Sequence, residues 1–184
     1  DGGDETFGGY LRYKAMKGSL YLSLPFQLLG KNITEKFSSL IPFKNKKYFR
    51  YLRRLVSALS EPPKLRNIQW HCFFSNEAKE NLYTDNMKKI LYNNTYNYLT
   101  DIFENAPAKN IMDRTFYTDL KAYLPECLLV KMDIASMANS LEARSPFLDH
   151  KVLEFSASLP SAWKLHGLTT KYILKKTFKK FLPK

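Results

Sequence analysis

The sequence of 184 residues is poor in glycine and cysteine, and both shortages exclude classes of site. None of its seven glycines lies between residues 31 and 166. A phosphate-cradling loop needs glycine, because backbone amides must approach the ligand closely. Such a loop must therefore lie in the first thirty residues or outside this chain. The two cysteines, Cys72 and Cys127, are too few to staple a secreted domain and lack metal-ligand spacing, which favours a reducing, cytoplasmic compartment.

Long apolar runs are also missing. No stretch approaches the roughly 18 apolar residues of a membrane span. The chain opens with an acidic, glycine-rich stretch, whereas a secretion signal carries positive charge and then an apolar core. Hydrophobic residues nevertheless make up 45% of the chain, which excludes wholesale disorder. A length of 184 residues predicts one domain with a single core.

Acidic residues are scarce relative to basic ones. The chain has 29 Lys and Arg against 17 Asp and Glu, a net charge of +12. This balance predicts an acidic partner, which could be nucleic acid, an anionic membrane surface, a phosphate-bearing substrate or the acidic part of a longer protein. Because the chain lacks an initiator methionine and stops shortly after a lysine-rich stretch, we expect it to be a piece of something longer.

Apolar residues at helical spacing dominate the glycine-free interior, so the chain is predicted to be mainly α-helical. Any strand is expected near residues 68–74, which are short and aromatic. Pro125 is expected to separate two helices, and Thr169 or Thr170 to cap the last one. Helices are expected over residues 48–59, from residue 75, and over 85–103, 112–123, 128–141, 150–158 and 171–181.

Two charged stretches could carry chemistry. Asp1, Asp4 and Glu5 place three carboxylates within five residues, and such repulsion is best tolerated beside a cation, a metal or a helix N-terminus. Magnesium takes one or two carboxylates together with phosphate oxygens. Residues 155–184 contain seven lysines and no acidic residue, which favours a nearby anion. The alternatives are a solvated acidic turn and a solvated lysine face.

A third stretch lies between these ends. Glu142, Arg144 and Asp149 surround a turn at Pro146, where an ion-pair cluster is favoured over a catalytic role. The three histidines show neither metal-ligand spacing nor the pattern of a nucleophilic triad.

Three segments together resemble the synthetase domain of glutamine-dependent asparagine synthetases, in the ATP-pyrophosphatase superfamily. Residues 1–10 are similar to the acidic glycine motif of that family, residues 124–150 to its LPxxLLxKxD and SLEARxPFLDH block, and residues 170–175 to its C-terminal lysine motif. The resemblance spans nearly the whole chain. It implies activation of the aspartate side-chain carboxylate by ATP and Mg²⁺, with release of pyrophosphate. Ammonia from an N-terminal glutaminase domain then displaces AMP.

The resemblance also implies roles for individual residues. Asp1 falls where the family places an acid near the acyl-adenylate, as a candidate to accept a proton from attacking ammonia. Asp4 is similar to a magnesium-binding aspartate, and Lys171 to the lysine that stabilises charge developing on phosphate. Glu126 and Lys131 match positions that line the pocket.

Two parts of the family pattern are missing from this sequence, namely the glycine-serine-aspartate pyrophosphate loop and the glutaminase domain. Residues 1–184 are therefore predicted to be a partial synthetase domain. They would form the C-terminal helical portion of an α/β adenine-nucleotide α-hydrolase-like domain whose parallel sheet lies mostly upstream. As an isolated fragment, the chain is expected to be inactive.

Three alternatives to the asparagine interpretation stay open. The same adenylation chemistry could act on another carboxylate, such as a sugar acid. The chain could instead be a basic helical module that binds nucleic acid, although its aromatic residues sit mostly at core spacing and no nucleic-acid motif is recognisable. A truncated relative with a structural role is the third alternative. The sequence does not fix the oligomeric state.

Overall fold

The computed structural model describes residues 1–41, 47–72, 74, 76–90 and 97–181. Over these ranges the chain is helical and has no β-strand beyond one isolated antiparallel bridge between His166 and Thr169. The prediction of a mainly α-helical chain is confirmed, whereas the parallel sheet expected upstream stays a prediction. Within the same ranges, no helix is long and apolar enough to cross a membrane.

The chain forms two compact units, where its length had suggested one core. Unit 1 combines residues 1–14 with residues 105–184, and unit 2 comprises residues 15–104. Unit 1 therefore joins the two ends of the chain, which carry all three motifs of the resemblance.

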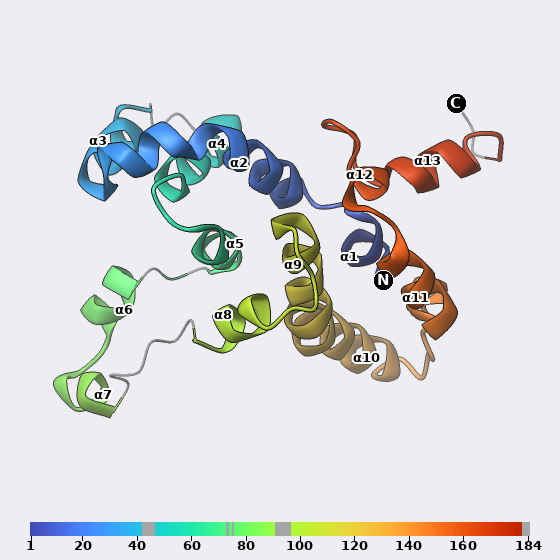
Figure 1. Cartoon of the computed structure of the whole chain (residues 1–184). Helices are drawn as coiled ribbons and strands as arrows, with labels where there is room; N and C mark the ends of the chain where they lie inside the picture. Colours follow the sequence, from blue (N-terminus) through green and yellow to red (C-terminus); the bar gives the residue numbers. More distant parts are fainter. Residues whose placement is uncertain (42–46, 73, 75, 91–96, 182–184) are drawn as a thin grey trace. The chain divides into compact units, whose positions relative to one another are not determined.

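Unit 2 is a set of helices in which α3 packs against α4, α4 against α5, and α5 against α8 (Figure 1). The boundary of the unit falls within α2, after Lys14. The helices are α2 (Leu11–Leu29), α3 (Lys31–Leu40), α4 (Lys47–Ala58), α5 (Pro63–His71), α6 (Asn76–Leu82), α7 (Asp85–Ile90) and α8 (Asn97–Glu104).

The guanidinium of Arg66 joins three segments of unit 2. The side chain is fully buried, and it donates hydrogen bonds to the carbonyl oxygens of Leu59, Glu61 and Ser19 at 3.3, 2.8 and 3.3 Å. It also donates to the hydroxyl of Ser19 at 3.1 Å. Burial lowers the pKa of Arg66, and the nearby Glu61 opposes this shift.

In unit 1, the short helix α1 packs against η1, η2, α11 and α13 (Figure 1). The acidic motif is thereby surrounded by the later segments of the chain. The elements of the unit are α1 (Gly3–Phe7), α9 (Ile111–Thr118), the π-helix η1 (Asp119–Leu129), α10 (Val130–Met137), the 3₁₀ turn η2 (Pro146–Leu148), α11 (His150–Ser158), α12 (Ser161–Lys164) and α13 (Tyr172–Phe178).

The predicted break at Pro125 is wrong. The chain runs from α9 through η1 into α10, and Pro125 lies inside the π-helical stretch. Proline disrupts an α-helix because it has no N–H to donate and its ring meets the carbonyl four residues back. A π-helix pairs residues five apart, so its wider turn relieves that clash. The segment that resembles LPxxLLxKxD therefore lies on one continuous, locally widened helix.

Other boundaries also differ from the sequence expectations. The strand considered for residues 68–74 is not found, because α5 continues to His71 and only Cys72 and Phe74 of the remainder are described. The helix expected over residues 85–103 is represented by α7 and α8, with residues 91–96 outside the description. The helix expected over residues 150–158 is confirmed.

Candidate active site

The glycines of the acidic motif permit close contact with the middle motif. A Cβ atom on Gly2 would overlap the Leu148 side chain, and Gly2 has a positive φ of 84° that L-residues rarely adopt. A Cβ on Gly3 would lie 3.1 Å from the Phe147 ring, which is tighter than ordinary contact. Gly2 and Gly3 therefore allow residues 1–10 to pack closely against the Pro146–Leu148 turn.

The acidic motif also meets the lysine motif. Lys171 Nζ lies 3.1 Å from Asp4 Oδ1 and forms an ion pair with it. Both side chains are partly exposed, 34% for Lys171 and 41% for Asp4. A Cβ on Gly9 would overlap both Asp4 Oδ1 and Lys171 Cε. The ion pair therefore requires a residue without a side chain at position 9.

Lys171 adopts an unusual backbone conformation. Its φ of 49° and ψ of 39° are left-handed, and it directly precedes α13, where Thr169 or Thr170 had been expected to act as the cap. A left-handed lysine costs about 1–2 kcal/mol. The turn before it is held by mutual backbone hydrogen bonds between His166 and Thr169, and the His166 ring stacks on Tyr172 at 4.6 Å. Lys171 therefore has a strained backbone conformation, and the hydrogen bonds and ring stacking of the neighbouring residues hold the turn before it in place.

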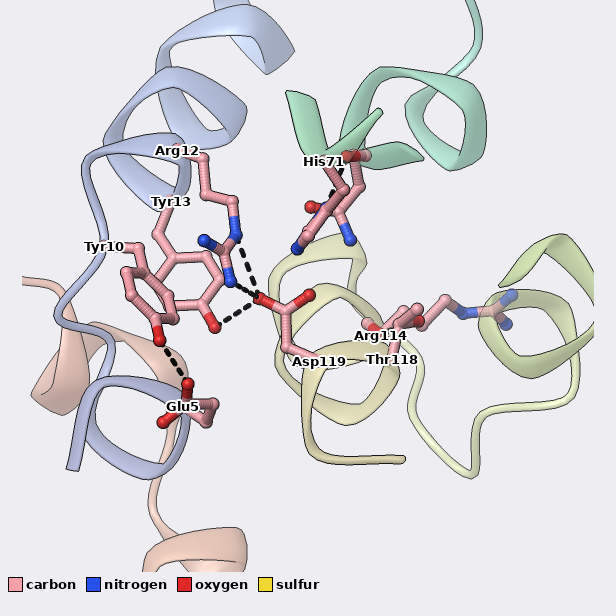
Figure 2. Close-up of polar contacts among 9 residues, drawn as sticks. Glu5, Tyr10, Arg12, Tyr13, His71, Arg114, Thr118 and Asp119 are labelled. Atoms are coloured by element: carbon pink, nitrogen blue, oxygen red, sulfur yellow. Dashed lines mark hydrogen bonds and ion pairs between the residues drawn. The ribbon is translucent and has the colours of Figure 1, made fainter. Parts of the chain in front are cut away.

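Glu5 differs from Asp4 in its surroundings, because Asp4 is partly exposed and pairs with Lys171 whereas Glu5 lies in the interior. Its side chain is buried, and it accepts a hydrogen bond from the Tyr10 hydroxyl (Figure 2). Burial of Tyr10, together with this bond to Glu5, raises the pKa of the Tyr10 phenol. The three early carboxylates therefore do not form one cluster, since Asp1 is exposed, Asp4 pairs with Lys171 and Glu5 bonds to Tyr10.

A second buried network adjoins this one. Asp119 Oδ2 accepts hydrogen bonds from Arg12 Nη2 at 2.8 Å and from the Tyr13 hydroxyl at 2.5 Å (Figure 2). The guanidinium of Arg12 lies 3.7 Å from the centre of the Tyr10 ring, so the two networks share this contact. Burial of Tyr13, and then the Asp119 charge, raises the pKa of the Tyr13 phenol well above its usual value.

The amino-acid sequence gives one signal for this network that the sequence analysis did not use. Met112, Phe116 and Tyr123 lie at helical spacing on the stretch expected to be helical, and Asp119 occupies the same apolar face. A carboxylate on such a face requires a partner. Arg12 and Tyr13 gave no comparable signal, because they are distant from Asp119 in the sequence.

Comparison with known proteins gives this geometry a context. The whole chain, residues 1–184, matches the family described as asparagine synthase. The chain belongs to the asparagine synthase family. The recognition made from the three motifs is thereby confirmed.

Two curated relatives are similar to this asparagine synthase chain. Glutamine-hydrolysing asparagine synthetase 1 of Bacillus subtilis (strain 168) is 28% identical over 190 residues, which cover 100% of this chain and 28% of the relative. Glutamine-hydrolysing asparagine synthetase 3 of the same organism is 30% identical over 120 residues, covering 59% of this chain and 19% of the relative. The chain thus spans less than a third of the length of these relatives. No solved structure matches it.

The other residues expected at the asparagine synthase site lie on the surface. Asp1 precedes α1, Glu126 belongs to η1 and Lys131 to α10, and all three are exposed. Within the described ranges, the side chains of Asp1 and Lys131 form no hydrogen bond or ion pair. The structure thus joins Asp4 to Lys171 directly, while Asp1, Glu126 and Lys131 keep their roles as predictions.

The ion-pair cluster expected around Pro146 forms only in part. Arg144 Nη2 lies 2.5 Å from Glu142 Oε1, and both side chains are well exposed. Asp149 is instead the N-cap residue of α11, and its carboxylate accepts a hydrogen bond from the backbone N–H of Lys151 at 2.9 Å. Its role as a helix cap explains why an acidic residue stands directly before that helix.

The donor set is sparse for a metal. No group of three or more His, Cys, Asp or Glu side chains that could hold a metal ion occurs in the described part of the chain. Asp4 provides a single accessible carboxylate beside an ammonium group. This arrangement fits a magnesium ion that takes most of its ligands from phosphate and water, and it does not fit a metal enclosed by protein ligands.

Proposed function

We propose that this chain carries the phosphate-handling part of an ATP-dependent amidotransferase. The reaction would adenylate the side-chain carboxylate of aspartate and transfer ammonia to it, giving asparagine, AMP and pyrophosphate. The observation that carries the proposal is the 3.1 Å contact between Asp4 and Lys171 in a chain of the asparagine synthase family. It brings a potential metal ligand and a positively charged side chain together, and both are partly exposed.

Lys171 suits the stabilisation of a leaving phosphate. Its ammonium is compact and can donate three hydrogen bonds, so it can follow charge that develops on phosphate oxygens. The short turn before α13 restricts the lysine backbone, which leaves its side chain to make the approach. Asp4 would hold Mg²⁺ beside it. The bound ion would supply electrostatic neutralisation of the phosphate oxygens.

Asp1 would accept the proton that ammonia loses on attack. Its exposed carboxylate stands three residues before Asp4, with Gly2 and Gly3 fixed against Leu148 and Phe147. Glu126 and Lys131 would line the substrate pocket from the widened helix and α10. The packing of α1 against η1 supports this placement for Glu126.

The ammonia would come from glutamine through a glutaminase domain. The names of both Bacillus subtilis relatives, which describe glutamine hydrolysis, support this part of the proposal. ATP and Mg²⁺ would be required by the adenylation step. The low cysteine content is compatible with the cytoplasmic setting expected for such an enzyme.

The test is a substrate comparison with the full-length protein. The protein is supplied with ATP, Mg²⁺ and glutamine or ammonium, and pyrophosphate release is measured with aspartate or with a uronic acid. We expect release that requires aspartate and is matched by formation of asparagine and AMP. Release that ignores aspartate but responds to the uronic acid would assign the chemistry to another carboxylate. Absence of ATP-dependent pyrophosphate release with either acid would reject the synthetase proposal.

A further inference from the structure

Helix α10 is rich in apolar residues but contains no buried side chain. Within the described part of the chain, it packs mainly against η1, which it continues. The large apolar side chains of residues 130–141 are each between 41% and 65% exposed, namely Val130, Met132, Ile134, Met137 and Leu141. A helix of eight residues is not stable in water by itself. Helix α10 therefore needs a surface that packs against it.

Three of these side chains form one stripe. Val130, Ile134 and Met137 stand at positions i, i+4 and i+7, so they share one face of the helix. Lys131 and Asp133 flank this face on its two sides. An apolar stripe between charged residues is the pattern by which a helix packs against a core. We call Val130, Ile134 and Met137 the α10 stripe.

We propose that the α10 stripe is covered by the part of the full-length polypeptide that lies outside residues 1–184. The match to asparagine synthetase 1 of Bacillus subtilis covers only 28% of that relative, so more than two thirds of a related chain lies outside it. The stripe falls within the segment that resembles the LPxxLLxKxD block, beside Lys131. A pocket lined by the exposed Lys131 needs an opposing wall, and chain packed on the stripe would supply it.

A second copy of the chain suits the stripe less well. A stable interface between separate proteins buries about 800 Å² on each partner, which is far more than three side chains of one short helix offer. A segment of the same polypeptide does not lose the translational and rotational freedom that association of two molecules costs. A small apolar stripe can therefore be covered within one molecule. This inference goes beyond the proposed function, because the covering of the stripe does not depend on any reaction.

Native methionines allow a test with the unmodified sequence. Met137 is 54% exposed in residues 1–184, whereas Met16 and Met112 are 0% and 7% exposed. The full-length protein is treated briefly with hydrogen peroxide, which converts accessible methionine to the sulfoxide. Mass spectrometry then gives the oxidation rate of each methionine in the native protein, relative to its rate in urea.

We expect the native protein to oxidise Met137 at least about tenfold more slowly than the unfolded protein, as it does Met16 and Met112. A native rate of Met137 close to its unfolded rate would overturn the proposal. Light scattering measures the mass at each protein concentration. Protection of Met137 that is lost on dilution, as the mass falls from two copies to one, would assign the stripe to a second copy and overturn the proposal too.

A pair of variants tests the stripe itself. Ile134→Asp places a charge within it, and Thr177→Asp is the control at an exposed position of α13. Because a buried charge must be hydrated, we expect Ile134→Asp to speed oxidation of Met137 in the native protein severalfold. Loss of soluble protein in this variant alone would have the same meaning, and equal behaviour of the two variants would contradict the proposal. These readouts contain no ATP, so loss of aspartate-dependent pyrophosphate release alone would reject only the proposed function.

Discussion

Gly9 lies against both members of the ion pair between Asp4 and Lys171. A side chain at this position would occupy the space that holds the Asp4 carboxylate and the end of the Lys171 side chain. The contact between the acidic motif and the lysine motif therefore depends on the smallest residue. Gly9 is a positioning residue in this account, since it acts only through its two neighbours.

Gly9→Ala should separate the pair while the fold persists. The added methyl group must push aside the Lys171 stem or the Asp4 carboxylate, and both are side chains that can move. We expect ATP-dependent pyrophosphate release by the full-length protein to fall about 10- to 100-fold, the effect of a displacement near 1 Å. Thermal unfolding should change little, because the displaced groups are partly exposed.

Gly18→Ala provides the matched control. Gly18 lies within α2, and a Cβ there would meet nothing within 4 Å. Alanine favours a helix over glycine by roughly 0.5–1 kcal/mol, so this variant should be as stable as the wild type or more so, with unchanged activity. Equal activities of the Gly9 and Gly18 variants would remove Gly9 from the site.

Tyr13→Phe tests the buried network around Asp119. The raised pKa of Tyr13 means that its phenol is protonated in both folded and unfolded states below about pH 10, so its hydrogen bond contributes fully there. Above that pH the unfolded chain loses the proton first, and stability falls. We expect Tyr13→Phe to lower the free energy of unfolding at pH 7 by about 1.5–3 kcal/mol. The decline above pH 10 should become shallower.

Urea denaturation between pH 7 and 11 measures both effects. Tyr21→Phe is a suitable control, because Tyr21 is 79% exposed. An alkaline decline as steep in Tyr13→Phe as in the control would show that Tyr13 does not titrate with folding.

Single residues divide into those that the sequence could indicate and those that it could not. Asp4 and Lys171 stand in recognisable motifs, so both were candidates before their contact was known. The sequence shows a glycine at position 9, but the reason that a glycine is needed there is its contact with Lys171, more than 150 positions away. The pairing of Arg12 with Asp119 could not be predicted for the same reason, since the two residues lie far apart in the sequence. Local patterns identify residue types at a site more readily than the residues that support them.

Arg66 is the buried side chain of α5 that bonds to three carbonyl groups outside the helix. Arg66→Met should keep the volume of the buried side chain while removing its hydrogen bonds to the carbonyls of Leu59, Glu61 and Ser19. We expect a loss of about 2–4 kcal/mol in the free energy of unfolding, because buried carbonyl groups lose their donors. Arg50→Met, at an exposed position of α4, should stay within about 0.5 kcal/mol. Similar urea midpoints for the two variants would contradict this role of Arg66.

The observed helices also show that the spacing of apolar residues predicts helix bounds well, whereas a proline does not always mark the end of a helix. The spacing of apolar residues placed α11 within its observed bounds and α4 within a residue of them. Pro125 was expected to break a helix, because the rule for α-helices assumes hydrogen bonds between residues four apart. The π-helical stretch avoids that assumption. No local signal in the sequence distinguishes such a widened turn from a break.

Across the whole chain, the first 14 residues and the last 80 belong to one compact unit. The family resemblance assigns Asp4 to magnesium and Lys171 to phosphate, which implies that the acidic and lysine-rich ends meet at one site. The contact between Asp4 and Lys171 agrees with that inference. Length alone could not indicate two units, because the division depends on which distant segments pack together.

The central claim is that Asp4 and Lys171 act together in ATP-dependent activation of aspartate. A double-mutant cycle with Asp4→Asn and Lys171→Gln measures it most directly, with kcat/KM for aspartate-dependent pyrophosphate release by the full-length protein as the readout. The account predicts that each single variant loses about 10²–10³-fold and that the double variant loses little more than the worse single variant. Losses that multiply in the double variant would show that the two residues act independently and would contradict the account.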